Sequence, residues 1–176
     1  MKASVFIGTS LDGFIARKNG EFDFLPEGGG ESHGYDEFIA DVDAIVIGRK
    51  TFETVLPMKP WPYGRKRVVV LSSRPLDFSA VVGGVVEQMS GEPAEIVSKL
   101  AASGANHLYI DGGITIQRFL RSGLIQRLII TRVPVLIGTG IPLFGSLEKD
   151  IHLRHISTKS YPSGLVTSEY EIADSK

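Results

Sequence analysis

The sequence contains no cysteine among its 176 residues. This absence excludes disulfide bonds, thiolate catalysis and cysteine zinc sites, and it is compatible with a reducing cytoplasm. Long hydrophobic runs are also absent, since none approaches the roughly 20 residues that a membrane span requires. Only a short apolar run precedes Asp12 at the N-terminus, which is not the pattern of a signal peptide. We therefore expect a cytoplasmic protein that does not enter a membrane.

Net charge is nearly absent as well, with a formal value of −1 at pH 7. No overall basic field therefore attracts the chain to nucleic acid or to an anionic membrane, although local basic residues can still bind a small anion. The four histidines show no spacing typical of ligands, so no metal site is expected. Hydrophobic residues make up 43% and charged residues 22%, as in ordinary globular proteins. The length favours a single domain over residues 1–176.

The sequence alternates between strand-like and helix-like segments. Short apolar runs predict strands, and apolar residues at helical spacing predict helices between them. The alternation continues to residue 133, after which the pattern indicates strands only. These end in a hairpin of residues 152–159 and 165–172 around Pro162-Ser163-Gly164. This order predicts an α/β fold of three layers, with a mixed, mostly parallel central sheet, helices on both faces and an antiparallel C-terminal hairpin.

Three local features refine this prediction. Ser32 is the expected N-cap of a helix that runs to Asp41. The preceding glycine run, residues 28–30, is typical of a mobile loop. Residues 81–89 are expected to form a strand with a bulge or bend at Gly83-Gly84.

Residues 107–123 are typical of a strand, a tight glycine turn and a helix. An apolar run ends at Ile110, Asp111-Gly112-Gly113 breaks it, and helical spacing follows from Thr115. Glycine lets a ligand approach the backbone closely, and the free N–H groups of a helix's first turn suit a phosphate. The alternative is an ordinary strand-to-helix turn that needs glycine only for its geometry.

Two further strand ends carry anion-binding chemistry. The first is Gly48-Arg49-Lys50-Thr51, where two cations stand at a helix N-terminus against the helix dipole, an arrangement that a bound polyphosphate favours. The second is Ser72-Ser73-Arg74, which suits a separate phosphate or is a solvated loop. Because ligands of open α/β sheets bind at the carboxyl ends of the strands, the three strand ends together favour a phosphorylated dinucleotide. The usual dinucleotide fingerprint and the triphosphatase phosphate loop are both absent.

In this order, the motifs resemble those of the dihydrofolate-reductase-like superfamily. The similarity rests on Ser10-Leu11-Asp12-Gly13 with Ala16, on the three strand ends above, and on the segment from Pro134 to Phe144. The chain is most similar to the C-terminal reductase domain of the bifunctional deaminase/reductase of riboflavin biosynthesis and to its stand-alone bacterial relatives. The zinc deaminase half of that enzyme is absent, since its signature needs cysteine.

The resemblance implies a cofactor, NADPH, and a set of residues that bind it. The pyrophosphate is expected at two turns, the 2′-phosphate at the serine–arginine segment, and the nicotinamide beside Gly8 and Ile15. The expected cofactor-binding residues are Gly8, Ile15, Gly48, Arg49, Lys50, Thr51, Ser72, Ser73, Arg74, Asp111, Gly112, Gly113, Ile114 and Thr115. The resemblance also implies a substrate-side role for Thr131 and a homodimer formed through the sheets.

The expected function is NADPH-dependent reduction of a small molecule, as by 5-amino-6-(5-phosphoribosylamino)uracil reductase. Asp12 is the first candidate for the proton donor, and Asp36 and Glu37 are the second candidates. The alternative for Asp12 is a turn residue that hydrogen-bonds its own backbone. Asp36 is also a candidate substrate ligand. True dihydrofolate reductases have a carboxylate four residues before the phenylalanine of this helix, a position that Gly34 occupies here. Reduction of a pteridine, dihydrofolate or another carbonyl compound is therefore the alternative activity, and non-catalytic NADPH binding is the alternative to an enzyme.

Overall fold

The computed structural model describes residues 1–26 and 33–173. The chain forms ten strands and four helices within these residues. The strands are β1 (Lys2–Ser10), β2 (Phe14–Ala16), β3 (Ala44–Gly48), β4 (Arg67–Leu71), β5 (Val85–Met89), β6 (His107–Asp111), β7 (Arg127–Val133), β8 (Ile141–Pro142), β9 (Leu153–Ser160) and β10 (Val166–Ile172). The helices are α1 (Tyr35–Ala40), α2 (Arg49–Val55), α3 (Pro93–Ala102) and α4 (Gly113–Arg121).

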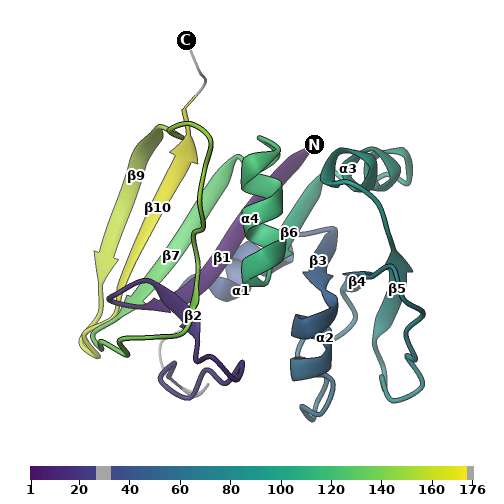
Figure 1. The fold of residues 1–176 in the computed structure, drawn as a ribbon, viewed down its shortest axis with the longest axis horizontal. Coiled ribbons are helices and arrows are strands. Elements are labelled where there is room, and N and C mark those ends of the chain that lie inside the picture. The colour runs from purple at the N-terminus through teal and green to yellow at the C-terminus, as the bar shows by residue number, and fades with distance from the viewer. Residues whose placement is uncertain (27–32, 174–176) are drawn as a thin grey trace.

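The main sheet has eight strands in the order β5-β4-β3-β6-β1-β7-β10-β9 (Figure 1). The first six of these strands are parallel, and β10 and β9 add antiparallel to the edge at β7. Strands β2 and β8 form a separate two-stranded sheet. The expected mostly parallel sheet with an antiparallel C-terminal hairpin is confirmed.

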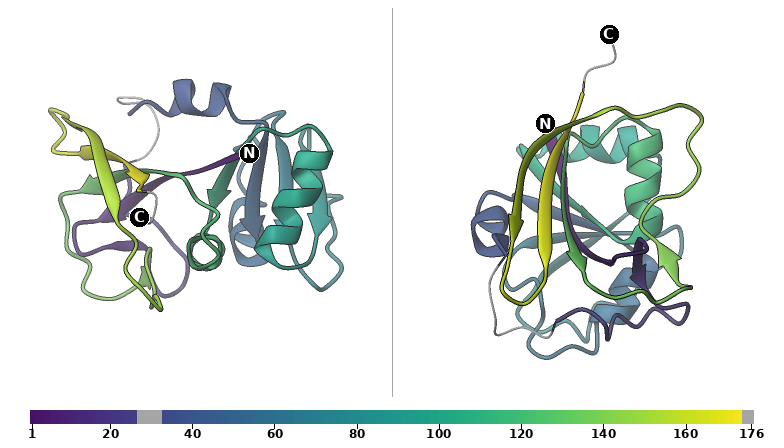
Figure 2. Two further views of the ribbon diagram at one scale, coloured as in Figure 1. Left: turned by 90° about the horizontal axis from the view of Figure 1, so that it is seen from above. Right: turned by 90° about the vertical axis from the view of Figure 1, so that its left-hand side faces the viewer.

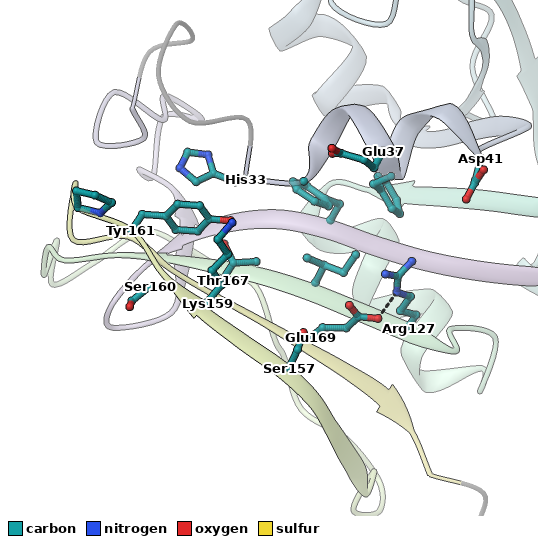
Figure 3. A pocket seen from close by; sticks show the side chains of 15 residues that line it. His33, Glu37, Asp41, Arg127, Ser157, Lys159, Ser160, Tyr161, Thr167 and Glu169 are labelled. Atoms are coloured by element: carbon teal, nitrogen blue, oxygen red, sulfur yellow. Dashed lines mark hydrogen bonds and ion pairs between the residues drawn. The ribbon is translucent and has the colours of Figure 1, made fainter.

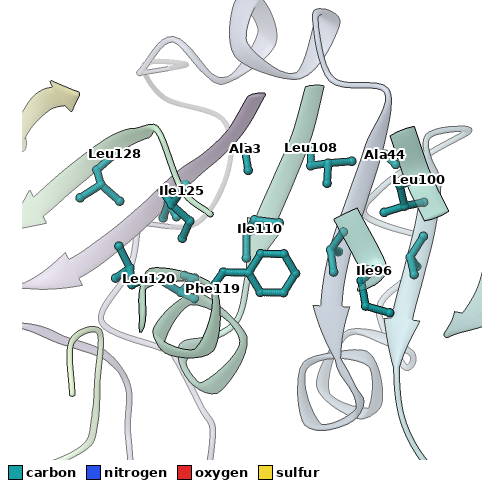
Figure 4. Close-up of a cluster of buried hydrophobic side chains, with 14 of the residues drawn as sticks. Ala3, Ala44, Ile96, Leu100, Leu108, Ile110, Phe119, Leu120, Ile125 and Leu128 are labelled. Carbon is teal, nitrogen blue, oxygen red and sulfur yellow. The ribbon is translucent and has the colours of Figure 1, made fainter. Parts of the chain in front are cut away.

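Helices cover both faces of this sheet, as Figure 2 shows from above. Helix α1 packs Phe38 against Phe6 and Tyr109, so we call the face that carries these rings the α1 face. Helices α3 and α4 cover the opposite face, which we call the α4 face (Figure 4). There, α3 and α4 bury Ile96 and Phe119 completely against alternate residues of the parallel strands.

Strand β3 shows why the sequences of the central strands are continuous apolar runs. Ala44 and Val46 pack on the α4 face, while Ile45 and Ile47 pack on the α1 face, and all four are fully buried. A parallel strand covered on both sides has no polar face. It can therefore present functional groups only at its ends.

Two of the predicted boundaries shift. Strand β5 begins at Val85 rather than at residue 81, since Gly83 has a φ of 74°, which breaks the extended run. Helix α1 begins after Gly34, and the expected N-cap Ser32 and glycine run 28–30 lie outside the described residues. Within the described parts of the chain, no helix has the length and apolar character of a membrane span.

Candidate active site

The site is built where two neighbouring parallel strands separate. Strand β1 pairs with β6 only over Lys2, Ala3 and Ser4, while its pairing with β7 continues to Ser10. Strand β6 remains paired with β3 as far as Asp111. The carboxyl halves of β1 and β6 therefore diverge, as Figure 1 shows.

A large cleft of about 1040 Å³ opens at this divergence. Its walls come from the carboxyl ends of β1 and β6, the starts of α2 and α4, and the segment of residues 15–25. The cleft brings together eleven of the residues expected to bind the cofactor. These are Gly8, Ile15, Gly48, Arg49, Lys50, Thr51, Asp111, Gly112, Gly113, Ile114 and Thr115.

The two glycine turns interlock across the mouth of the cleft. A Cβ added to Gly48 would stand 2.9 Å from the Thr115 hydroxyl, and a Cβ on Gly112 would come even closer to the Thr51 hydroxyl. Each turn thus lies against the threonine of the other helix. Gly112 also has a φ of 91°, a conformation that L-residues rarely adopt. Side chains larger than hydrogen are excluded here, so the main chain itself forms the surface of the cleft.

The N-termini of α2 and α4 also suit an anion. Neither α2 nor α4 has a side-chain cap, and neither carries an acidic residue in its first turn. The first N–H groups of a helix have no partner within the helix, so a ligand in the cleft meets them as donors. Arg49 and Lys50 add positive charge on α2, with Arg49 paired to Glu53 at 2.7 Å. The residues present therefore fit a dinucleotide pyrophosphate.

The serine–arginine segment lies beside the cleft rather than in its wall. Leu71, at the end of β4, lines the cleft next to Gly48, and residues 72–74 follow it. Ser72 accepts the Arg74 main-chain N–H at 3.1 Å, which shapes the segment into a tight turn with an exposed Arg74 side chain. Its role at the 2′-phosphate stays a prediction.

Asp12 lies outside the cleft and has a structural set of partners. Its carboxylate accepts hydrogen bonds from the Ser10 hydroxyl at 2.6 Å and from the Gly138 N–H at 2.8 Å, with a weaker one from Ile137. The Ser10 hydrogen bond, with those main-chain donors, lowers the pKa of Asp12. A carboxylate stabilised in this way is a poor proton donor. The contacts match the alternative of a turn residue that also tethers residues 137–138.

Asp111 has the opposite environment at the wall of the cleft. Its carboxylate accepts the Gly112 N–H at 2.8 Å and the Tyr63 hydroxyl at 3.3 Å. Burial raises the pKa of Asp111, against the opposing effect of these hydrogen bonds. Tyr63 is a functional candidate that sequence reasoning missed, because it belongs to a proline-rich loop 48 residues away.

The two candidate substrate residues lie apart from this cleft. Thr131 is buried on β7, opposite Gly8 of β1, and its hydroxyl shares a 2.7 Å hydrogen bond with Thr167. Asp36 is exposed on α1, as is Glu37, because Tyr35 and Phe38 take the inward face of that helix. Their substrate roles stay predictions.

A second cavity of about 770 Å³ lies on the α1 face, between α1 and the strands β7, β10 and β9 (Figure 3). Phe6 lines both cavities and so lies between them. The floor carries the ion pair of Arg127 with Glu169, 2.6 Å apart, and Lys159 and Tyr161 stand at one end. No group of metal-ligating side chains occurs among the residues that the structure describes.

Comparison with known proteins connects this geometry to a family. The model of the RibD C-terminal domain matches residues 2–167. The uncharacterized protein YwjB of Bacillus subtilis strain 168 is 32% identical over 163 residues, which cover 91% of this chain and 92% of YwjB.

Two solved structures show the same fold. A candidate riboflavin biosynthesis protein from Shewanella sp. PV-4 is 38% identical, with a TM-score of 0.90 over 98% of this chain and 99% of that one. The diaminohydroxyphosphoribosylaminopyrimidine deaminase/5-amino-6-(5-phosphoribosylamino)uracil reductase of Thermotoga maritima is 14% identical, with a TM-score of 0.74. It is matched over 98% of this chain and 56% of its own length, and at this identity the likeness concerns the fold alone.

Proposed function

This chain belongs to the RibD C-terminal domain family, and from that membership we propose that it is an NADPH-dependent reductase of a small molecule. The observation that carries the proposal is the pair of uncapped glycine turns at the mouth of the cleft, where Gly48 lies against Thr115 and Gly112 against Thr51. Main-chain donors without side-chain competition are what a pyrophosphate requires.

In this proposal the chain holds the cofactor along the carboxyl edge of the sheet. The two turns bind the pyrophosphate, Arg49 and Lys50 offset its charge, and Gly8 and Ile15 pack on the nicotinamide. Arg74 and its two serines bind the 2′-phosphate, which makes the protein prefer NADPH over NADH. When bound, NADPH supplies a hydride to the substrate.

The favoured substrate is a pyrimidine with an open ribosyl phosphate chain, such as 5-amino-6-(5-phosphoribosylamino)uracil. Support comes from the family and from the shared fold of the Thermotoga maritima deaminase/reductase. The inner cleft offers the aromatic rings of Phe6 and Tyr109, on which a flat base packs. Reduction of dihydrofolate fits less well, since neither Asp36 nor Glu37 lines the cleft that holds the two glycine turns.

The test is a thermal-shift titration with NADPH, NADH and NADP⁺. A ligand at about 100 times its Kd stabilises the native state by about 2.7 kcal/mol, which corresponds to a rise of roughly 5–10 °C for a chain of this size. We expect NADPH to stabilise more than NADH, and Arg74→Ala to remove the difference. Arg121→Ala is the matched control, because Arg121 is exposed at the far end of α4.

Turnover is then measured as loss of NADPH absorbance with 5-amino-6-(5-phosphoribosylamino)uracil. Oxidation of NADPH supports the proposed substrate class. Binding of NADPH without oxidation by this compound or by pteridine and aldehyde substrates favours the non-catalytic alternative. If no dinucleotide shifts the midpoint, the reductase proposal is refuted.

We further propose a homodimer, in line with the family expectation. All eight residues of β9 are exposed and those of β10 are only half-buried, although both strands belong to the main sheet. Such a sheet edge is a surface that a second copy can cover. Sedimentation equilibrium checks the state, and a monomer at high protein concentration refutes it.

A further inference from the structure

A row of polar side chains crosses the sheet on the α1 face and ends in the second cavity. Gly8 of β1 pairs with Thr131 of β7, Thr131 pairs with Thr167 of β10, and Thr167 pairs with Lys159 of β9. Residues that pair directly across neighbouring strands point to the same face of a sheet. The 2.7 Å hydrogen bond between the two threonine hydroxyls agrees with this, and Thr167 and Lys159 both line the second cavity. We call Thr131, Thr167 and Lys159 the polar row.

The polar row connects the two cavities of the protein. Its first partner, Gly8, lines the cleft beside the position expected for the nicotinamide, and its last member, Lys159, lines the second cavity. Phe6, two residues before Gly8 on the same strand, lines both. Because neighbouring strands lie about 4.8 Å apart, three steps across the sheet place the Lys159 main chain about 14 Å from Gly8.

The Lys159 ammonium group is held in place without being neutralised. Its Nζ lies 5.0 Å from the centre of the Tyr161 ring, and the His33 ring packs edge-on against that ring at 4.7 Å. A cation–π contact orients an ammonium group and leaves its charge available to an anion. No carboxylate pairs with Lys159 among the residues that the structure describes, whereas Arg127, the other cation of the cavity, is paired with Glu169 at 2.6 Å.

The acidic side chains of this cavity leave the Lys159 end open to an anion. Figure 3 shows Lys159 and Tyr161 at one end of the cavity and Asp41 at the other, with Glu37 between them on α1. A ligand that enters at the first end therefore meets one positive charge without a counter-ion. The Thr167 hydroxyl beside it on β10 can donate or accept a further hydrogen bond.

From this arrangement we propose that Lys159 binds the phosphate of the substrate and that the sugar chain of the substrate lies along the polar row. The inference rests on the proposed reductase function and narrows its substrate class to compounds with a phosphate at the far end of a sugar-length chain. At roughly 1.5 Å per bond, an extended chain from the reacting carbon to the phosphorus reaches about 7 Å and a lysine side chain about 6 Å. These two lengths match the distance from Gly8 to the Lys159 main chain.

The proposal assigns the phosphates of cofactor and substrate to different cations. Arg49 and Lys50 line the cleft at the start of α2, where the cofactor pyrophosphate is expected, and Lys18 lines the same cleft. None of these three residues lines the second cavity, and Lys159 does not line the cleft. The two ligands therefore do not compete for one positive charge.

The first measurement needs neither NADPH nor turnover. Lysines are labelled with ¹³C at the ε carbon, and the resonance that is lost in Lys159→Met identifies Lys159. We expect ribose 5-phosphate to shift this resonance in a saturable way and ribose to leave it in place. The resonance of Lys149, an exposed lysine that lines neither cavity, is the matched control and should not move. The absence of a saturable shift, or an equal shift with ribose, overturns the proposal.

The second measurement compares 5-amino-6-(5-phosphoribosylamino)uracil with its dephosphorylated form as substrates. Lys159→Met removes the charge but keeps a side chain of similar length. We expect the KM of the phosphorylated compound to rise roughly 10-fold, since hydrogen bonds to charged groups contribute about that much. The kcat should change little, because the phosphate is bound equally in the ground state and the transition state. The KM of the dephosphorylated compound should stay as in the wild type, and Lys159→Arg, which keeps the charge, should restore most of the loss.

Two other lysines provide the controls for these kinetics. Lys149→Met should leave both KM values unchanged, and Lys18→Met tests the competing cation of the cleft. A wild-type KM in Lys159→Met overturns the proposal, as does a rise that is equal for the two compounds or that occurs only in Lys18→Met. If the wild type binds NADPH but leaves the phosphorylated compound unreduced, the substrate assignment of the proposed function fails. The titration with ribose 5-phosphate then still decides whether Lys159 binds a sugar phosphate.

Discussion

Replacement of Gly112 by alanine tests whether the main chain forms the floor of the cleft. Gly112 has φ 91° and ψ 135°, a region of backbone conformation that is nearly restricted to glycine. An alanine there is strained by about 1–3 kcal/mol. Its methyl group would also press on the Thr51 hydroxyl, and overpacking of this kind costs about 1–3 kcal/mol. We therefore expect the free energy of unfolding to fall by roughly 2–6 kcal/mol.

Gly123→Ala provides the matched control at the other end of α4. Gly123 also has a positive φ, 67°, but nothing lies within 4 Å of the position that its Cβ would take. Its substitution should lower the free energy of unfolding by only about 1–2 kcal/mol. Urea unfolding can be followed through Trp61, the single tryptophan, which is 8% exposed in the native state.

Thr51→Ala separates the two contributions to the Gly112 effect. In this background the added methyl group meets no hydroxyl, so the crowding cost should vanish while the backbone strain remains. The double-mutant cycle should then show a coupling of about 1–3 kcal/mol. NADPH binding, measured by fluorescence titration, should be lost in Gly112→Ala and retained in Gly123→Ala. Equal destabilisation by the two alanines refutes the crowding, and unchanged NADPH affinity refutes the assignment of the turn.

Three other substitutions test separate features. Asp12→Asn should lower the thermal midpoint at neutral pH, and this penalty should shrink as the pH falls from 3.8 through the lowered pKa of Asp12, because a depressed carboxyl pKa stabilises the fold only while the group is ionised; a penalty that does not change with pH refutes this. Gly8→Ala should leave urea stability nearly unchanged, since the methyl group meets the flexible end of Leu25, yet weaken NADPH binding at least ~10-fold, or about 1.4 kcal/mol. Tyr109→Phe removes the donor to a partly buried main-chain acceptor of β1 and should cost about 1–3 kcal/mol in urea unfolding, whereas an unchanged stability refutes this role of the hydroxyl.

The sheet and the glycine turns could be predicted because their signals are local. An apolar run that ends in glycine and a hydroxyl residue marks a strand-to-helix turn wherever it occurs, as at Gly48 and Gly112. The rule that ligands bind at carboxyl strand ends then brings the turns together without knowledge of the strand order. The structure agrees, since both turns line one cleft.

The different surroundings of two aspartates could not be predicted from local patterns. Asp12 and Asp111 both precede a glycine at the end of a predicted strand. Their tertiary contacts distinguish the two residues. Gly138 donates a hydrogen bond to Asp12 from 126 residues away in the sequence, and Tyr63 donates one to Asp111 from 48 residues away. The path of the loop that carries Tyr63 depends on the packing of Trp61 against Phe52, which no periodicity describes.

A hydrogen bond from Tyr109 to the main chain of β1 explains how the two strands can separate to form the cleft. Where β1 leaves β6, the main chain of β1 loses its neighbour on that side, and an unpaired buried carbonyl is costly. The Tyr109 hydroxyl donates to the Phe6 carbonyl at 2.9 Å, so a side chain replaces the missing ladder bond. The Tyr109 side chain therefore lies between β1 and β6, where direct main-chain pairing would bring the two strands closer together. The strands can thus remain apart, and the cleft lies open between them.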